Sequence, residues 1–474
     1  MADSGDDRTR PAVGSYEKGW HDPVLYPVTT GEGLTEEVIR RISAAKDERV
    51  DVLDRRLEAL ALFEEMHLPE WVDEQILAGL DLGRICFYAR PEGEQVDEWR
   101  AVPRPLRATF ERLGVPDSER RELAGLCAQY DSEVVYHRNR SELERLGVVF
   151  ADMDTAVRDH WDLVGPYFGS VVPVGDNKFS ALNAAVWSGG SFVYVPAGVH
   201  VERPLQAYYR VNAEHLGQFE HTLLVVEEGG FVHYVDACSA TTYDTASLHV
   251  GVVEVVAKEG ARCRITGIQD WPQNVYNLAI KRAIAHRDST VEWVDANIGA
   301  RLTMSYPSVV LQGEQAHGAV LSIGYAAGGQ HQNTGARMIH LAPDTTSTVT
   351  SKSISRRGGR AGYRGLVQVA PNASSARSFV RCDSLILDEQ SRSDTYPHLD
   401  VEEATSRVGH EATVSRIDEG RLFYLMSRGL GEEEATALMV TGFVEPISRE
   451  LPLNCAEEVN RLIALDMTAA GAVG

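Results

Sequence analysis

The sequence has no closely spaced cysteines. Its six cysteines are at least 25 residues apart and stand at positions 86, 127, 238, 263, 382 and 455. The missing CxxC pair argues against a zinc site or a ferredoxin-type cluster held by one short segment. Scattered cysteines are typical of reduced thiols, which predicts a cytoplasmic protein.

Long apolar runs and positive charge are also scarce. The opening segment MADSGDDRTRPAVGS lacks the apolar core of a secretory signal, and no apolar run approaches the roughly 18 residues of a membrane span. With 46 Lys and Arg against 69 Asp and Glu, the formal net charge is −23. Nucleic acid and anionic membranes are therefore poor partners. The basic stretch RRGGRAGYRG (356–365) could grip an anion, but a solvated loop is the simpler interpretation.

Common enzyme motifs are missing as well. The chain has no GxxxxGK[ST] sequence, so we do not expect it to hydrolyse ATP alone. HEATV at 410–414 offers no second histidine four residues on, and no GxSxG elbow occurs. A glycosidase stays conceivable, because carboxylates are too numerous to pair by sequence. We expect a protein that is not itself an enzyme.

Four segments follow in order along the 474 residues. Residues 1–15 are expected to be disordered, and 16–150 to form a helical region in which Thr35 caps a helix. Short β-rich runs such as SFVYVP, HTLLVVEE and HVGVVEVVAKE fill 160–415. Helical periodicity returns over 416–474, which could cap the β region or dock a partner.

The β-rich region is too long for most sandwiches. Its strands recur every 8 to 15 residues, a spacing that fits a sandwich, a barrel or a solenoid. Glu-Gly turns at 228–230 and 259–260 repeat about 30 residues apart. A run of some 250 residues with little helix favours a solenoid in which short strands stack into long parallel sheets.

Segments across the whole chain closely resemble the SufB members of the SufB/SufD family, which serve the SUF iron–sulfur assembly machinery. They occur in the family's order and include SYEKGW, GSVVPVGDNKFSALNAAVWSGGSFVYVPAGV, RVNAEHLGQFEHTLLVVEEG, YPSVVLQG, TGARMIHLAPDTTSTVTSKSIS, YRGLVQV, RCDSLILD, GHEATVSRI and LFYLMSRGL. The resemblance implies a mainly β core, a right-handed parallel β-helix, flanked by helical N-terminal and C-terminal regions. It also implies a SufD-type paralogue or a second copy of the chain as partner, and a SufC-type ATPase bound through the C-terminal helices.

Cys382 matches the family's acceptor cysteine, in the segment RCDSLILD. A thiolate both receives persulfide sulfur and binds iron as a soft ligand. Taken alone, a cysteine in an apolar strand is more often a buried structural residue. The resemblance reverses that interpretation.

His410 and Glu411 match the family's HEAT segment and are expected to hold iron with Cys382. Imidazole and carboxylate are harder ligands than thiolate and suit a metal that must be released. On a strand these adjacent side chains point to opposite faces, so both cannot reach one iron without a bend, and we rank Glu411 first. Many members carry an acid before this histidine, whereas this chain has Gly409.

Cys238 matches a second family cysteine, where sulfur enters from the sulfur donor of a cysteine desulfurase system. The resemblance implies a path for sulfur from Cys238 to Cys382 that is lined by polar side chains, and the matching positions here are Arg210, Asn212, Gln269, Trp271 and Lys281. Periodicity alone would let them face solvent. His221 stands where the family usually has arginine, so the charge near the entry differs. Cys86, Cys127, Cys263 and Cys455 match no family ligand and are expected to be structural.

The leading hypothesis is a scaffold that builds a transient iron–sulfur cluster and passes it to target proteins. The alternative is a non-catalytic SufD-like subunit that supports another chain's site, although such chains generally lack the acceptor cysteine. A reduced flavin accompanies some members of the system, but no flavin motif is visible here. Homodimer or heterodimer, the cluster type and the iron donor stay open.

Overall fold

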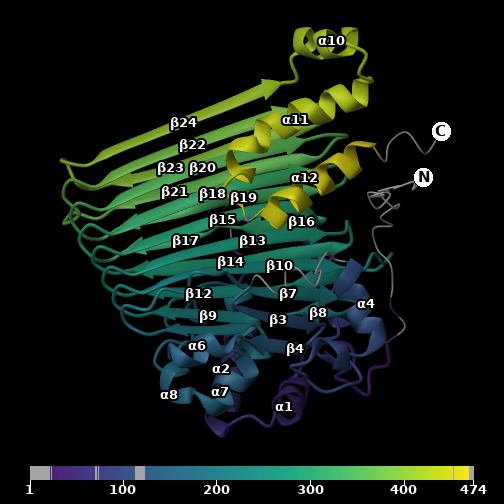
Figure 1. Cartoon of the computed structure of the whole chain (residues 1–474), viewed down its shortest axis with the longest axis vertical. Coiled ribbons are helices and arrows are strands. Elements are labelled where there is room, and N and C mark those ends of the chain that lie inside the picture. The colour runs from purple at the N-terminus through teal and green to yellow at the C-terminus, as the bar shows by residue number, and fades with distance from the viewer. Residues whose placement is uncertain are drawn as a thin grey trace, which may run out of the picture.

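A computed structural model describes residues 22, 24–69, 72, 74–112, 123–451 and 453–468. The segment 1–15, predicted to be disordered, lies outside the described residues. Strands stack into a tall body, with helices at the N-terminal end and along one face (Figure 1). Among the described residues, no helix has the length and apolar character of a membrane span.

Two large sheets form the body, and their strands alternate along the chain. The ten-stranded sheet contains, in spatial order, β24 (Arg407–Arg416), β22 (Arg377–Ile386), β20 (Thr346–Ser355), β18 (His317–Ala326), β15 (Thr290–Gly299), β13 (Arg262–Trp271), β10 (Phe231–Ala240), β7 (Leu205–Val211), β3 (Gly125–Tyr130) and β4 (Glu133–Asn139). The twelve-stranded sheet contains β23 (Arg392–Val401), β21 (Arg360–Val369), β19 (His331–His340), β16 (Leu302–Ser305), β14 (Val275–Ala285), β12 (Val252–Ala257), β9 (His221–Val226), β6 (Ser191–Val195) and β5 (Val149–Asp152), with β17 (Ser308–Leu311), β11 (Ser247–His249) and β8 (Gly217–Gln218) alongside.

Parallel pairing runs from β7 to β24 in the first sheet and from β6 to β23 in the second. This pattern confirms the predicted β-solenoid over the sandwich and the barrel that strand spacing left open. The Glu-Gly repeats mark stacked turns, because Gly229 and Gly260 have φ of 67° and 68° and the Gly229 amide donates to the Glu259 carbonyl at 2.8 Å. Glycine adopts such positive φ without steric cost.

Many strands are buried on both faces. All seven residues of β7 and all six of β9 are buried. Tyr209 and Leu224 point into the solenoid, whereas Tyr208 and Leu223 point outward and are covered by the N-terminal region. Strands covered on both sides read as continuous apolar runs, so alternation of hydrophobicity does not identify their inner face.

The N-terminal region covers the first turns of the solenoid. The Thr35 side chain accepts from the Val38 amide at 3.3 Å, which confirms the predicted helix cap. The helices are α1 (Glu36–Ala45), α2 (Val50–Glu65), α3 (Glu74–Leu77), η1 (Leu82–Arg84), η2 (Trp99–Ala101), α4 (Arg104–Arg112), α6 (Ser141–Arg145), α7 (Met153–Asp159), α8 (Trp161–Val164) and α9 (Lys178–Val186). A small antiparallel sheet joins β1 (Val28–Thr29) to β2 (Ala89–Arg90).

This region is less helical than predicted. Within 16–150, strands β3 and β4 form an antiparallel hairpin, which turns at Asp131 with a φ of 54°. β3 also pairs in parallel with β7 and so extends the ten-stranded sheet. The hairpin is strand because it continues a sheet whose other members lie far along the chain, which a local pattern does not reveal.

The predicted C-terminal helices are α10 (Glu419–Ser427), α11 (Glu432–Ser448) and α12 (Leu453–Thr468). α11 and α12 pack through Val440, Val444 and Leu462 onto the outer face of the ten-stranded sheet. α10 projects past the last strands at the top of the view (Figure 1), and its Phe423 and Tyr424 are 73% and 55% exposed.

β23 and β24 end the two sheets, and we call them the open end of the solenoid. Each pairs with a described strand on one side only. Large apolar side chains are exposed here, among them Tyr396, Leu399, Val401 and Val414. Natural proteins rarely leave such an edge uncovered, since unpaired backbone groups recruit other strands.

Candidate functional site

Cys382 lies on the inner face of β22, one strand from the open end. It is 3% exposed, and its Sγ lies 3.8 Å from Nε2 of His410 on β24. Burial raises the pKa of the Cys382 thiol to about 12; the nearby Tyr363 hydroxyl opposes this shift, and the charge of Asp383 adds to it. The thiol is therefore protonated near neutral pH in the isolated chain.

His410 and Glu411 point to opposite faces of β24. In the register, His410 is opposite the inward-facing Val380, and Glu411 is opposite Arg381, which is exposed. Glu411 is exposed, whereas His410 is half-buried and burial lowers its pKa. A neutral imidazole can serve as a metal ligand. The structure thus brings His410 to Cys382 and leaves Glu411, the residue we ranked first, on the outer face.

Cys238 lies on the inner face of β10 and is 3% exposed. Gln269 Nε2 donates to its Sγ at 3.3 Å, and Trp271 Nε1 donates to Gln269 Oε1 at 2.9 Å. Burial, reinforced by the charges of Asp236 and Glu220, raises the pKa of the Cys238 thiol. Two of the predicted path residues therefore contact the predicted entry cysteine or its neighbour.

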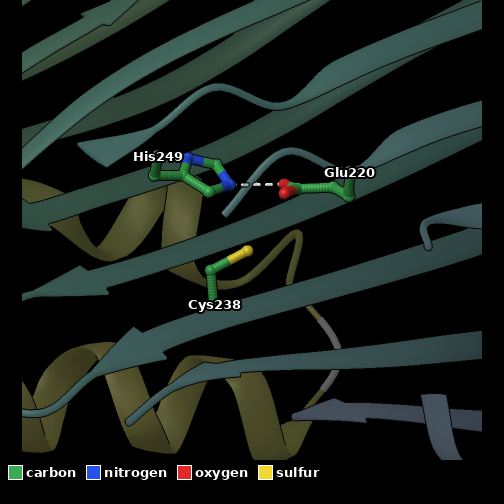
Figure 2. Close-up of side chains that lie close together, drawn as sticks. All are labelled: Glu220, Cys238 and His249. Atoms are coloured by element: carbon green, nitrogen blue, oxygen red, sulfur yellow. Dashed lines mark hydrogen bonds and ion pairs between the residues drawn. The ribbon is translucent and has the colours of Figure 1, made fainter. Parts of the chain in front are cut away.

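Glu220 and His249 complete a buried cluster with Cys238, shown in Figure 2. One ligand atom from each residue lies within 4.8 Å of the other two. His249 Nε2 and Glu220 Oε1 form a hydrogen bond or ion pair. Although burial acts against it, the Glu220 carboxylate raises the pKa of His249. We call these three residues the Cys238 cluster.

Lys281 lies inside the solenoid close to Cys238. Its Nζ is 2.8 Å from Asp295 Oδ1, and both side chains are at most 2% exposed. Asp236 faces the same space: a Cβ placed on Gly267 would meet Lys281, Asp295 and Asp236 within 2.9 Å. Glycine at position 267 thus leaves room for a buried cation between two carboxylates.

Arg210 and Asn212, the other predicted path residues, are buried away from the interior. Arg210 follows the inward-facing Tyr209 on the strand and therefore points outward, where it donates to the Thr241 hydroxyl at 3.1 Å. Asn212 accepts from the Asp22 amide at 3.0 Å. These side chains therefore join the N-terminal region to the outer face of the sheet.

A column of polar side chains runs along the inner face from the Lys281 site to Cys382. The register aligns these residues in the order Asp236, Gly267, Asp295, Ser322, Ser351 and Cys382. Ser322 Oγ donates to Ser351 Oγ at 2.9 Å, and both serines are buried. Five strand spacings separate Asp236 from Cys382, a span of about 24 Å. We call this set the polar column.

Sequence reasoning did not find Glu220, His249, Asp236, Asp295 or the two serines. They come together in the fold because each strand stacks on a strand about 30 residues earlier in the sequence. The repeat of the Glu-Gly turns carries that period and could have aligned them. His221, which stands where the family usually has arginine, points outward. Its Nε2 lies 2.8 Å from Glu254 Oε2.

The remaining cysteines lie apart from both sites. Cys127 and Cys263 are buried, and Cys86 is half-buried, with its Sγ 3.3 Å from the Tyr88 carbonyl oxygen. The side chain of Cys455 lies outside the described residues. Among the thiols that the structure describes, Cys238 has a side-chain amide and Cys382 an imidazole as hydrogen-bond partner on the inner face.

Two family models match the chain. "SUF system FeS cluster assembly, SufBD core domain" covers residues 209–443, and "SufBD protein N-terminal region" covers 127–207. The iron-sulfur cluster assembly protein SufB of Bacillus subtilis is 48% identical over 98% of this chain and 99% of its own length. An iron-sulfur cluster assembly SufBD family protein of Staphylococcus epidermidis is 49% identical over the same shares, and one of Staphylococcus aureus is 48% identical.

The fold and the site define a parallel β-solenoid with helical end regions and, near its open end, a buried thiol beside a half-buried imidazole. The comparisons make the assignment specific. The chain belongs to the SufB/SufD family of iron–sulfur cluster assembly proteins.

Proposed function

We propose that this chain is a scaffold on which an iron–sulfur cluster is built from persulfide sulfur and iron. The observation that carries the proposal is the pairing of Cys382 with His410 inside the last turn of the solenoid. Thiolate and imidazole are both ligands that iron accepts. The relative named for cluster assembly is 48% identical over 98% of this chain, which supports the same role here.

Sulfur enters at Cys238 in this proposal. The Cys238 thiolate attacks the terminal sulfur of a donor persulfide, the donor's S–S bond breaks, and the donor leaves as a thiolate. The polar column offers hydrogen-bonding groups between Cys238 and Cys382. Because the interior is packed, passage requires the solenoid to open transiently. Reduction of each sulfane sulfur to sulfide takes two electrons, for which a reduced flavin is the expected donor.

The ligand set on this chain is incomplete. Cys382 and His410 supply two donors, and Glu411 faces outward from the open end. A SufD-type paralogue or a second copy, docked against β23 and β24, would supply the rest. Apolar side chains such as Leu399 and Val414 are available for that contact. Strand edges pair with partners through main-chain hydrogen bonds.

A SufC-type ATPase is the partner we propose for α10. This helix presents exposed Phe423, Tyr424 and Met426 next to the open end (Figure 1). ATP-driven motion there would be transmitted to β24 directly, since α10 follows it after two residues. The buried, protonated Cys382 thiol would then become accessible to iron and to a base that accepts its proton. We place this assembly in the cytoplasm.

The test is anaerobic co-expression with an ATPase and a paralogue of the same system, followed by subunit stoichiometry and a visible absorption spectrum. The proposal predicts cluster absorbance that depends on this chain's Cys382. If the cluster instead remains on the paralogue after this chain is dissociated, the chain is a supporting subunit.

A further inference from the structure

The Cys238 cluster contains the donor atoms of a metal site. Glu220, Cys238 and His249 offer oxygen, sulfur and nitrogen within 4.8 Å of one another. Their side chains converge from three different strands or loops (Figure 2). Ligands of a tetrahedral ion bound at 2.0–2.3 Å lie roughly 3.3–3.8 Å apart. The pairs of atoms that now lie farthest apart would approach by at most about 1 Å, whereas His249 Nε2 and Glu220 Oε1, which are in hydrogen-bond contact, would move apart.

Burial leaves part of this cluster unsatisfied. Glu220, Cys238 and His249 are 5%, 3% and 2% exposed. The second carboxylate oxygen of Glu220, Oε2, has no hydrogen-bond partner among the described residues. A buried carboxylate oxygen without a partner is costly, and a bound cation removes that cost. Asp236 lies nearby, and its charge has a larger electrostatic effect on Cys238 than the charge of Lys281 has.

The neighbours orient the histidine as a ligand. Asn277 Oδ1 lies 2.7 Å from His249 Nδ1, so Nδ1 carries a proton and donates to it. Nε2 is then the nitrogen that faces Glu220 and Cys238. Metal-bound histidines usually donate their second N–H in this way. The Trp271 ring, with its centroid 4.6 Å from that of His249, closes one side of the imidazole.

We propose that the Cys238 cluster binds a divalent transition-metal ion such as Zn²⁺ or Fe²⁺ through Glu220, Cys238 and His249. Mixed sulfur, nitrogen and oxygen donors favour such ions over Mg²⁺ or Ca²⁺. Binding releases the thiol proton and any proton shared by His249 and Glu220. A fourth coordination position stays open for water. This site is separate from Cys382 and does not depend on cluster assembly.

The site has a consequence for sulfur entry. Coordination to a metal ion makes the Cys238 thiolate a weaker nucleophile toward a persulfide, so the two uses of Cys238 compete. If sulfur enters at Cys238 as proposed above, zinc at this cluster would slow persulfide transfer to Cys238 while leaving Cys382 intact.

Cobalt provides the direct test, because thiolate coordination gives Co²⁺ a charge-transfer band. Co²⁺ is titrated anaerobically into the full chain carrying Cys382→Ala, so that the acceptor thiol contributes nothing. The proposal predicts that each chain binds one Co²⁺ ion with a charge-transfer band, and that the band disappears when Zn²⁺ displaces Co²⁺. The band is lost when Cys238→Ala is added and kept when Cys263→Ala is added, since Cys263 is an equally buried interior thiol.

Two further variants separate a metal site from an ordinary buried ion pair. His249→Gln and Glu220→Gln are expected to weaken Co²⁺ binding at least tenfold. The matched control is His221→Gln, which removes a buried histidine paired with Glu254 outside the cluster and should leave binding unchanged. Should Cys238→Ala not fold, these variants decide. The proposal is overturned if no band forms, if it survives loss of Cys238, or if His249→Gln matches His221→Gln.

Discussion

The Cys382 thiol and the His410 imidazole face each other across adjacent strands, with Sγ 3.8 Å from Nε2. The neighbouring Glu411 points the other way. In the function proposed above, this geometry favours the histidine over the carboxylate as an iron ligand in the isolated chain.

His410→Asn is therefore expected to lower the iron affinity of the isolated chain by at least about tenfold, as loss of a metal ligand does. Glu411→Gln should change it less than threefold. Anaerobic titration with Fe²⁺ measures both. A larger loss in Glu411→Gln would show that β24 bends to turn this carboxylate inward.

Alkylation of Cys382 should be slow and strongly pH-dependent. Burial raises the pKa of its thiol to about 12, and only the thiolate reacts. The rate with iodoacetamide, followed by mass spectrometry of the Cys382 peptide, should rise about tenfold per pH unit from pH 7 to 10. A plateau below pH 9 would mean that the chain stabilises the thiolate.

Lys281 is expected to be essential for stability. Lys281→Met leaves Asp295 and Asp236 buried without their cation, which should lower the free energy of unfolding by about 3–5 kcal/mol. Urea unfolding followed by circular dichroism measures the change. The control is Arg287→Met, which removes a solvent-exposed ion pair and should have little effect. Equal stability of the two variants would contradict the buried charge cluster.

Asp131 should make the stability depend on pH. Burial raises its pKa to about 6 in the folded chain, against about 3.9 when unfolded, so the folded state binds the proton more tightly. The resulting stabilisation is complete below pH 4 and is lost as the pH rises through 6.

Asp131→Asn removes this dependence. Between pH 4 and pH 7 the stability of the variant relative to the natural chain should rise by about 2 kcal/mol. Urea unfolding at the two pH values measures the difference. A constant difference would mean that Asp131 titrates normally because the hydrogen bonds it accepts from Tyr26 and the Asn212 amide, which lower its pKa, offset the effect of burial.

The solenoid could be predicted because its repeat is visible in the sequence. The Glu-Gly turns at 228–230 and 259–260 recur once per turn, and each places a glycine with positive φ at the same corner. The hairpin of β3 and β4 was missed because its partner β7 follows some 80 residues later. Local patterns do not carry such long-range pairing.

The candidate site was predictable in part, for a related reason. The opposite orientations of His410 and Glu411 follow from strand geometry alone. The outward position of Arg210 does not, because every residue of β7 is buried and both faces look alike in sequence. Glu220 and His249 lie close to Cys238 only because neighbouring turns of the solenoid stack in this register, which the local sequence does not show.

Reconstitution of the Cys382→Ser chain with iron, sulfide and its partner subunits tests the central claim most directly. Cys263→Ser is the matched control, because it removes a buried interior thiol away from His410. The account predicts that visible cluster absorbance is lost in Cys382→Ser and retained in Cys263→Ser. Undiminished absorbance in Cys382→Ser would contradict it.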